Sequence, residues 1–324
     1  MRRPLTPLVP DRRRLLRWAA LLSLAAPALH PGPAWAGGAV RLHTGAPEGS
    51  PADLWARAFA PFLERHLPHN SVEVVARPEG GPVAMLGDLA RAPGAIGTVL
   101  APDILARIAA SDRPRALAGF RFLAAVTEEP LVLVAAPGTE LAALRESGAV
   151  LALPPPGSTA ALAAEALLHA TAAAAVHFPS GTAARLAAQS GNTAAALVRL
   201  PDAIGAIRDN RVAALALATA ARSDLLPETP TLTELGIPLT AAARRGFVLP
   251  PGATAGFASL ITAALRDVVA DPEYVAQSRD GGMLPQLRDE AAWTAELGLA
   301  TPAPQIAGGT PMTGGPARSS RISP

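Results

Sequence analysis

The chain has 324 residues, of which 50% are hydrophobic and 17% are charged, so it can bury the cores of about two domains and is neither fibrous nor disordered. Its formal net charge is +2, but six arginines and one aspartate lie in the first 36 residues, which leaves the remainder slightly acidic and without lysine. This distribution argues against nucleic-acid binding, because such binding needs clustered basic side chains. Cysteine is absent, which excludes disulfides, thiolate metal sites and cysteine nucleophiles.

The first 36 residues have the three parts of a cleavable signal peptide. A basic stretch ends at Arg17, an apolar run covers residues 18–29, and Ala34-Trp35-Ala36 is a small-x-small cleavage triplet. The apolar run is shorter than the roughly 20 residues that a membrane-spanning helix needs. Residues 11–17 also fit a twin-arginine pattern, so both the Sec and the twin-arginine routes remain open. We therefore expect an exported protein.

After this segment, strand patterns alternate with helix patterns. Strands are expected over residues 39–44, 71–76 and 95–100, and helices over 83–91 and 103–110. Another helix, capped by Asp53, is expected between the first two strands. Its apolar face would contain Leu54, Trp55, Ala58, Phe59, Phe62 and Leu63.

The apolar segment 120–136 is expected to leave the first domain. Glu128-Glu129-Pro130 interrupts it, and residues 131–134 are its most strand-like part. A second α/β series follows, with strands expected over 149–153, 176–178, 194–197 and 212–218 and helices over 141–146, 159–171, 182–190 and 202–209. A return strand is expected over residues 246–249, before an amphipathic helix over 254–269.

This order of elements predicts an α/β protein of two domains, each a mostly parallel sheet flanked by helices. If the last helix packs on the first domain, the chain crosses between domains twice, near 131–136 and near 246–249, and the crossovers form a hinge. The expected parts are a signal peptide (1–36), a discontinuous domain 1 (37–135 and 246–300), domain 2 (136–245) and a disordered tail (301–324). Ligands of hinged α/β pairs bind between the domains.

One stretch resembles a family signature. Residues 222–236 read RSDLLPETPTLTELG, which is similar to the pattern R-S-x-x-L-P-(D/E)-x-P-T-x-x-E-x-G of the Bug family. These are the periplasmic substrate-binding proteins of tripartite tricarboxylate transporters. Further similarity at 199–216, 246–252 and 271–273 extends the resemblance over roughly residues 39–299. The resemblance implies a periplasmic-binding-protein-like fold and a periplasmic location.

The signature also has a physical reading as scaffold. Pro227 and Pro230 stiffen a loop, Thr231 and Glu234 form a capping box, and Gly236 ends a short helix. We therefore expect the ligand to be bound elsewhere.

The resemblance implies that a ligand carboxylate is held by backbone N–H groups and small hydroxyls of two loops, one in each domain. The candidates in the first loop are Glu48, Gly49, Ser50 and Asp53. Here Glu48 replaces a glycine of the relatives, and the loop is one residue longer. If Glu48 faces the cleft it repels a carboxylate and favours a neutral or amine-bearing ligand, whereas if it faces solvent it is only a surface charge.

The second loop contributes Gly157, Ser158 and Thr159, at the start of a helix that Ser158 or Thr159 caps in either reading. Further candidates are Ser180, in a segment that lacks the Tyr-Lys pair of relatives, and Arg199, Pro201 and Asp202. Arg199 is the best candidate for a charged contact with an acid, because a guanidinium binds a carboxylate at two points. A solvated surface arginine is the alternative. His177 is interpreted as a packed strand histidine.

The expected function is that of an extracytoplasmic solute-binding receptor, which captures a small organic acid by domain closure and delivers it to a tripartite tricarboxylate-type transporter. The alternative is an orphan or signalling receptor of the same fold, with a neutral or amine-bearing ligand and no transport role. Catalytic motifs such as G-x-S-x-G and H-E-x-x-H are missing, so no enzyme activity, metal or cofactor is expected. The expected partners are the small metabolite and, transiently, membrane permease subunits; we expect a monomer that binds no nucleic acid.

Overall fold

The computed structural model describes residues 38–67, 69–77 and 79–299. The signal peptide expected at 1–36 and the tail expected at 301–324 lie outside the described residues. In the described part of the chain, no helix combines the length and the apolar character needed to cross a membrane.

Strand–helix units open the described chain. Strands β1 (Ala39–Thr44), β2 (Ser71–Val75) and β3 (Ala95–Ala101) pair in parallel in the order β2-β1-β3, as expected. The helices of this region are α2 (Pro51–Arg65), α3 (Gly81–Leu89), α4 (Asp103–Ala106) and α5 (Arg113–Ala116). Helix α4 is shorter than the expected 103–110.

Helix α2 differs from the expectation in its cap and in its buried face. The N-cap is Ser50, whose side chain accepts a hydrogen bond from the backbone N–H of Asp53; the prediction that Asp53 is the cap is wrong, because Asp53 already lies in the first turn. Leu54, 57% exposed, and Ala58 face solvent. The apolar face expected for this helix was therefore too wide. Residues 55, 59 and 62 form its buried row, and residues 54 and 58 form the neighbouring row, which is exposed.

Strand β4 (Arg121–Ala135) runs without interruption through Glu128-Glu129-Pro130. Residues 121–130 pair with β9 (Ala242–Leu249), and residues 131–135 pair with β7 (Ala195–Arg199) and β8 (Ala213–Leu217). The expected interruption is wrong because Pro130 stands where β4 exchanges one set of partners for the other, so its missing N–H breaks no continuous ladder.

Strands β5 (Val150–Leu153) and β6 (Ala174–His177) complete the second half of the sheet, in the order β4-β7-β5-β6. The helices here are α6 (Thr159–Ala163), α7 (Glu165–Thr171), α8 (Gly181–Gln189) and α9 (Ile204–Arg208). The helix expected over 159–171 is thus divided at Ala164. Short 3-10 helices occupy Leu141–Arg145 and Leu200–Asp202.

The return strand β9 begins at Ala242 rather than Gly246 and pairs antiparallel with β3 and β4. Helix α10 (Ala255–Ala270) then packs against α2 and β4, so the chain has returned to the first half of the sheet. The last elements are α11 (Pro272–Asp280), β10 (Leu284–Asp289) and α12 (Glu290–Glu296). Because most residues of β10 are half exposed or polar, its sequence shows no strand pattern.

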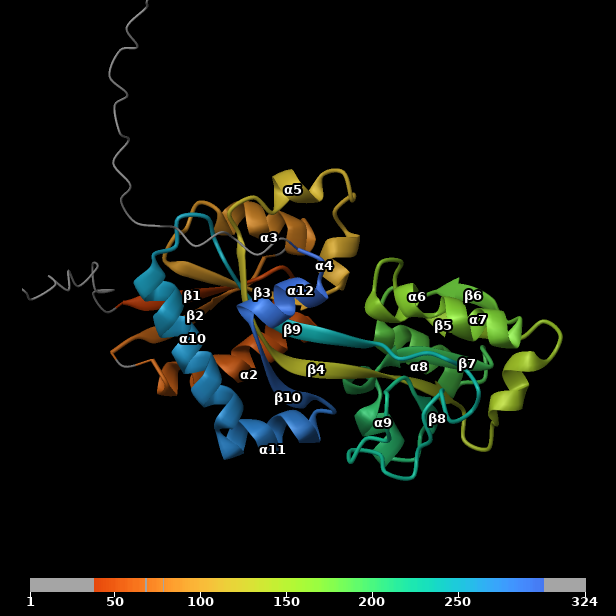
Figure 1. Ribbon diagram of the computed structural model, residues 1–324. Coiled ribbons are helices and arrows are strands. Elements are labelled where there is room, and N and C mark those ends of the chain that lie inside the picture. Colours follow the sequence, from red (N-terminus) through yellow and green to blue (C-terminus); the bar gives the residue numbers. More distant parts are fainter. Residues whose placement is uncertain (1–37, 68, 78, 300–324) are drawn as a thin grey trace, which may run out of the picture. The chain divides into compact units, whose positions relative to one another are not determined.

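The parallel strands sit in two groups, β2-β1-β3 and β6-β5-β7, while β4, β8, β9 and β10 pair antiparallel, so the sheet as a whole is mixed. Strands β4 and β9 run side by side between the two groups (Figure 1). We call β1, β2, β3, β9, β10 and residues 121–130 of β4 the first sheet half, and β5 to β8 with residues 131–135 of β4 the second sheet half.

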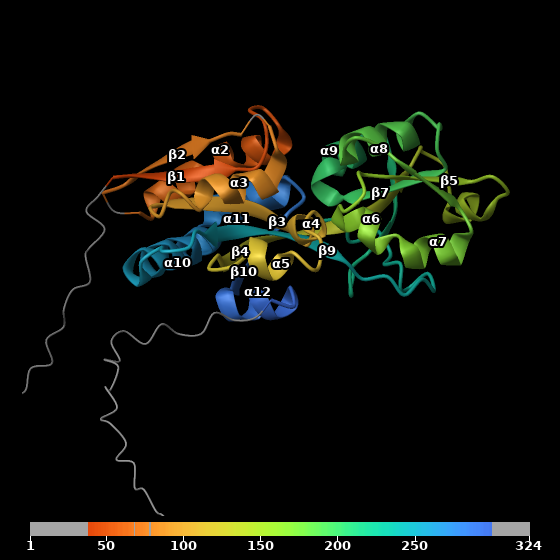
Figure 2. The same ribbon diagram turned by 90° about the horizontal axis from the view of Figure 1, so that it is seen from above.

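Helices α2 and α12 lie on opposite faces of the first sheet half (Figure 2). Successive residues of β9 face these two helices in turn, because neighbouring positions of a strand point to opposite faces of the sheet. Phe247 packs on Trp55 and Phe59 of α2, with ring centroids 6.0 and 5.0 Å apart. On the other face, Gly246 leaves room for Trp293 of α12, since a Cβ atom there would lie 2.6 Å from the indole. The α2 face of β9 is the one that carries the candidate site.

Candidate functional site

Four charged side chains meet where β4 passes from one sheet half to the other. Glu129 of β4 has Oε1 at 2.8 Å from Nε of Arg245 on β9, and Oε2 at 2.6 Å from Nη1 of Arg199 on β7. Asp202 accepts bonds from Nε and Nη2 of Arg199, both at 3.2 Å. We call Glu129, Arg199, Asp202 and Arg245 the Glu129 cluster; its two positive and two negative charges balance.

Sheet register explains why these residues meet. Arg245 stands opposite Thr127 on β4, and Arg199 stands opposite Leu131. Residues 127, 129 and 131 share one face of β4, so both arginines are diagonal neighbours of Glu129. The cluster therefore depends on strands contributed by both sheet halves.

Burial and charge act in opposite directions within the cluster. Burial by itself would raise the pKa of Glu129, but the charges of Arg245 and Arg199 outweigh it and hold this pKa below its usual value. Although burial acts to lower the pKa of Arg199, the carboxylates of Asp202 and Glu129 raise it. The Glu129 carboxylate and the Arg199 guanidinium are therefore ionised at neutral pH.

Arg245 is buried but incompletely bonded. Its side chain is 7% exposed, and its guanidinium carbon lies 4.9 Å from the ring centroid of Trp55. Its Nε binds Glu129, whereas among the described residues no hydrogen-bond partner meets either terminal nitrogen, Nη1 or Nη2. The outer edge of the guanidinium is thus available for the two-point contact that arginine makes with carboxylates.

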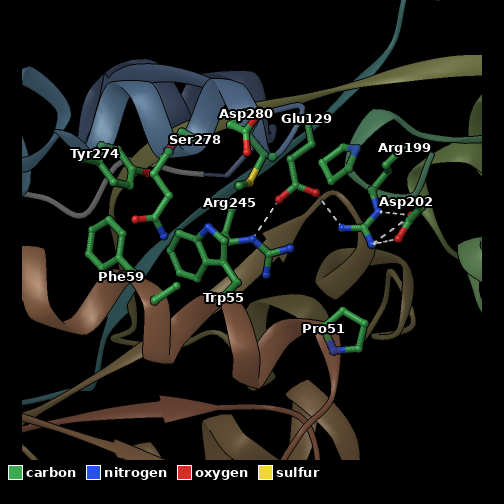
Figure 3. A pocket seen from close by; sticks show the side chains of 15 residues that line it. Pro51, Trp55, Phe59, Glu129, Arg199, Asp202, Arg245, Tyr274, Ser278 and Asp280 are labelled. Carbon is green, nitrogen blue, oxygen red and sulfur yellow. Dashed lines mark hydrogen bonds and ion pairs between the residues drawn. The ribbon is translucent and has the colours of Figure 1, made fainter. Parts of the chain in front are cut away.

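This edge lies in a cavity of about 420 Å³. Figure 3 shows the guanidinium beside the indole of Trp55, with its terminal nitrogens on the side away from Glu129. The cavity is lined by Pro51, Trp55, Ala58, Phe59, Glu129, Arg199, Pro201, Asp202, Arg245, Tyr274, Gln277, Ser278, Asp280, Gly281 and Met283. A volume of this order accommodates a small metabolite.

Two larger cavities are also lined by arginines. In a cavity of about 470 Å³, Arg244 binds Glu128, Gln286 and Glu296. In one of about 560 Å³ beside α5 and α12, Arg113 likewise bonds through Nε alone, to backbone carbonyls, but this residue is half-exposed, so water can reach its terminal nitrogens. The combination of burial and unbonded terminal nitrogens at Arg245 therefore marks the 420 Å³ cavity as the candidate site.

The first predicted loop is organised around the start of α2. Asp53 is fully buried and accepts hydrogen bonds from Nε of Arg57 at 2.8 Å and from the N–H of Gly49 at 2.9 Å. The bond from Arg57 is the main reason that the pKa of Asp53 is lowered. Glu48 pairs with Arg57 at 3.2 Å, and its side chain is 80% exposed. The surface position agrees with the reading in which Glu48 does not repel a ligand.

The second predicted loop binds a carboxylate of the protein itself. Oδ1 of Asp103, the first residue of α4, accepts hydrogen bonds from the hydroxyl of Thr159 and, at 2.9 Å, from its backbone N–H. Ser158 caps α6 through the N–H of Ala161, and Gly157, with φ of +81°, packs near Ala106. Burial raises the pKa of Asp103 despite these bonds.

The third segment shows a related arrangement. Ser180 caps α8 through the N–H of Ala183 at 3.1 Å. A Cβ atom on Gly181 would lie 2.3 Å from Oδ2 of Asp202, so the absence of a side chain lets this carboxylate approach the first turn of α8. Nδ1 of His177 lies 2.7 Å from the carbonyl oxygen of Pro154, but the residue is exposed, so the interpretation of His177 as a packed histidine is wrong.

The structure thus gathers Arg199, Pro201 and Asp202 around the cavity, together with Pro51 of the first loop. The other predicted residues make the caps and ion pairs just described and do not line it: Glu48, Gly49, Ser50, Asp53, Gly157, Ser158, Thr159 and Ser180. Sequence reasoning missed Glu129 and Arg245. The signal was present, because Glu128-Glu129 and Arg244-Arg245 are charged pairs within apolar strand patterns.

The family model described as "Tripartite tricarboxylate transporter family receptor" matches residues 122–294, more than half of the chain. Three solved structures share the fold. MatC from Rhodopseudomonas palustris with bound malate has a TM-score of 0.67 and 20% identity, over 81% of this chain and 95% of that one. A second R. palustris protein, with adipate, has a TM-score of 0.70 and 17% identity, over 82% of this chain and 94% of that one. The periplasmic binding protein BugD has a TM-score of 0.68 and 19% identity, over 81% of this chain and 93% of that one. No curated protein sequence matches.

Proposed function

Because the chain belongs to the tripartite tricarboxylate transporter receptor family, we propose that it captures a small organic acid outside the cytoplasm and delivers it to the permease subunits of such a transporter. The members of this family are solute-binding receptors and not enzymes, so the chain binds its ligand without chemical conversion. Residues 1–36, with their basic, apolar and small-residue parts, support export to the periplasm by the Sec or the twin-arginine route.

The observation that carries the acid ligand is the free edge of Arg245. A buried cation with two unbonded nitrogens in a cavity is a strong site for a carboxylate, because binding supplies the missing charge-assisted hydrogen bonds. Malate in MatC and adipate in the second R. palustris protein are carboxylates, which supports the same ligand class here.

The mechanism that we propose is closure of two domains around the acid. Domain 1 would comprise residues 37–135 and 246–300, and domain 2 residues 136–245, with β4 and β9 as the crossovers. Both sheet halves line the cavity, so a ligand that contacts Arg245 and Pro201 favours the arrangement in which these residues are close.

A second candidate is a receptor for a neutral or amine-bearing metabolite with a signalling role. It is favoured by the carboxylates of Asp103 at the start of α6 and of Asp202 beside α8. These acids reduce the attraction of the two helix starts for an anion. The ligand charge therefore separates the two candidates.

A thermal-shift screen of the mature chain against matched organic acids, amides and amines tests the proposal. A ligand at a hundredfold excess over its Kd adds about 2.7 kcal/mol to the free energy of unfolding. We expect acids to raise the melting temperature and their amides to have little effect. A shift with amines or amides alone would favour the second candidate, and no shift with any class would contradict a receptor function for this cavity.

A further inference from the structure

Of the two arginines among the described residues that line the cavity, only Arg245 has unbonded terminal nitrogens. All three nitrogens of Arg199 are already bonded, Nη1 to Glu129 and both Nε and Nη2 to Asp202. Arg245 uses Nε alone and leaves Nη1 and Nη2 without a partner in the described chain. The cavity therefore has one site at which a carboxylate gains a two-point contact.

Beyond this edge, the cavity has an aromatic and apolar wall. Trp55 and Phe59 of α2 stack with ring centroids 4.9 Å apart, and Phe59 meets Tyr274 of α11 edge-on at 5.4 Å. Ala58 and Met283 extend this wall. Such a surface gains free energy when it contacts the apolar part of a ligand.

The remaining charges on the cavity wall are negative. Glu129 and Asp202 belong to the Glu129 cluster, and Asp280 of α11 pairs with Arg208 at 2.8 Å. The other polar side chains of the wall, Gln277 and Ser278, are neutral, so a second ligand carboxylate would lie near these acids with no unpaired cation among the lining residues. Charge thus disfavours ligands with two carboxylates.

From this arrangement we infer that the receptor selects monocarboxylates with an apolar or aromatic body. The carboxylate binds the Nη1–Nη2 edge of Arg245, and the body lies along Trp55, Phe59 and Met283. This inference rests on the proposed function and narrows its ligand class, so its test has to separate failure of the narrower claim from failure of the broader one.

Three ligands with the same six-carbon chain provide the test: hexanoate, adipate and hexanamide. Isothermal titration of the mature chain should give a Kd for hexanoate at least tenfold lower than that for adipate, and no measurable binding of hexanamide. Adipate binding as tightly as hexanoate would overturn the selectivity and leave the acid receptor intact. Equal binding of hexanamide, or no binding of either acid, would overturn both claims.

A gain-of-function variant makes the test independent of any loss of folding. Ala58 lies on the exposed side of α2 and lines the cavity, so Ala58→Lys adds a second cation to the apolar wall without burying it. We expect Ala58→Lys to tighten adipate severalfold and to weaken hexanoate, whereas the neutral control Ala58→Gln should not favour adipate. An unchanged ratio of the adipate and hexanoate Kd values in Ala58→Lys would contradict the inferred position of the ligand.

Discussion

Arg245 is held on one side and open on the other. Glu129 fixes Nε, and Trp55 covers one face of the guanidinium, which orients the terminal nitrogens before any ligand arrives. A donor that is already oriented loses little conformational entropy on binding. The single residue Glu129 thereby organises both arginines of the site.

Arg245→Lys tests the two-point contact. The single amine of a lysine can still pair with Glu129, so the cluster keeps its charge balance. The two terminal nitrogens that would bind the ligand carboxylate are lost. We expect the Kd of an organic acid to rise at least tenfold, about 1.4 kcal/mol, as measured by isothermal titration. The matched control is Arg244→Lys, since Arg244 binds Glu128 and Glu296 outside this cavity. Wild-type affinity in Arg245→Lys would rule out the contact.

Asp103→Asn tests the buried carboxylate at the start of α6. Because burial raises the pKa of Asp103, the folded protein favours its protonated form; the resulting stabilisation is present at low pH and is lost as the pH rises through the folded-state pKa. Asparagine keeps an oxygen for Thr159 and never ionises. The melting temperature of Asp103→Asn relative to wild type should therefore be higher at pH 7 than at about pH 4.

The surface variant Asp267→Asn, on an exposed position of α10, is the control for this pH comparison. If Asp103→Asn lowers the melting temperature by the same amount at both pH values, the carboxylate serves only as a hydrogen-bond acceptor and burial does not penalise its charge.

At the scale of elements, the capping box in the Bug-family signature takes the expected form. The N–H of Glu234 donates to Oγ1 of Thr231 at 3.1 Å, and the Glu234 carboxylate accepts from the N–H of Thr231 at 2.7 Å. Gly236 follows with φ of +81°, but the segment between is a turn rather than a short helix. The family match over residues 122–294 confirms the resemblance that this stretch indicated.

Thr231→Ala tests whether the signature is scaffold. Thr231 is buried, and its hydroxyl caps the turn, so its loss should reduce the free energy of unfolding by about 1 kcal/mol without changing ligand affinity. Chemical denaturation and titration of the same preparation measure the two effects, and exposed Thr233→Ala is the control. A large loss of affinity in Thr231→Ala would place the signature in the ligand site instead.

Most elements could be predicted because their apolar side chains recur with helix or strand period, as in β1 and α10, or form a short apolar run, as in β3. Strand β10 and helix α12 could not, because they are short and partly exposed. The site was harder still. Arg199 could be singled out from the resemblance and from the chemistry of its guanidinium. Its meeting with Glu129, 70 residues away, and that of Glu129 with Arg245, 116 residues away, depend on sheet register that no local pattern encodes.

At the scale of the whole molecule, several polar contacts connect the two sheet halves besides the Glu129 cluster. Arg279 of α11 pairs with Asp224 at 2.5 Å, Arg208 of α9 pairs with Asp280 at 2.8 Å, and Asp103 of α4 binds Thr159 of α6. The two ion pairs are exposed and contribute little stability individually, whereas the Asp103–Thr159 and Glu129–Arg199 contacts are at least partly buried. Closure as proposed would therefore rest on these buried contacts together with those of the ligand.

Cross-linking measures that closure, because the chain contains no cysteine of its own. With Asp224→Cys and Arg279→Cys in one protein, a short bifunctional maleimide should link the two positions faster when hexanoate is saturating. Adding Arg245→Lys should abolish the dependence on hexanoate. A cross-linking rate that is unaffected by a ligand known to bind would contradict closure.

The most direct test of the central claim is a crystal structure of the mature chain with a bound organic acid. The account predicts both carboxylate oxygens within about 2.7 to 2.9 Å of Nη1 and Nη2 of Arg245, with the ligand body against Trp55. A carboxylate bound instead at Ser158 and Thr159, with the edge of Arg245 left free, would contradict it.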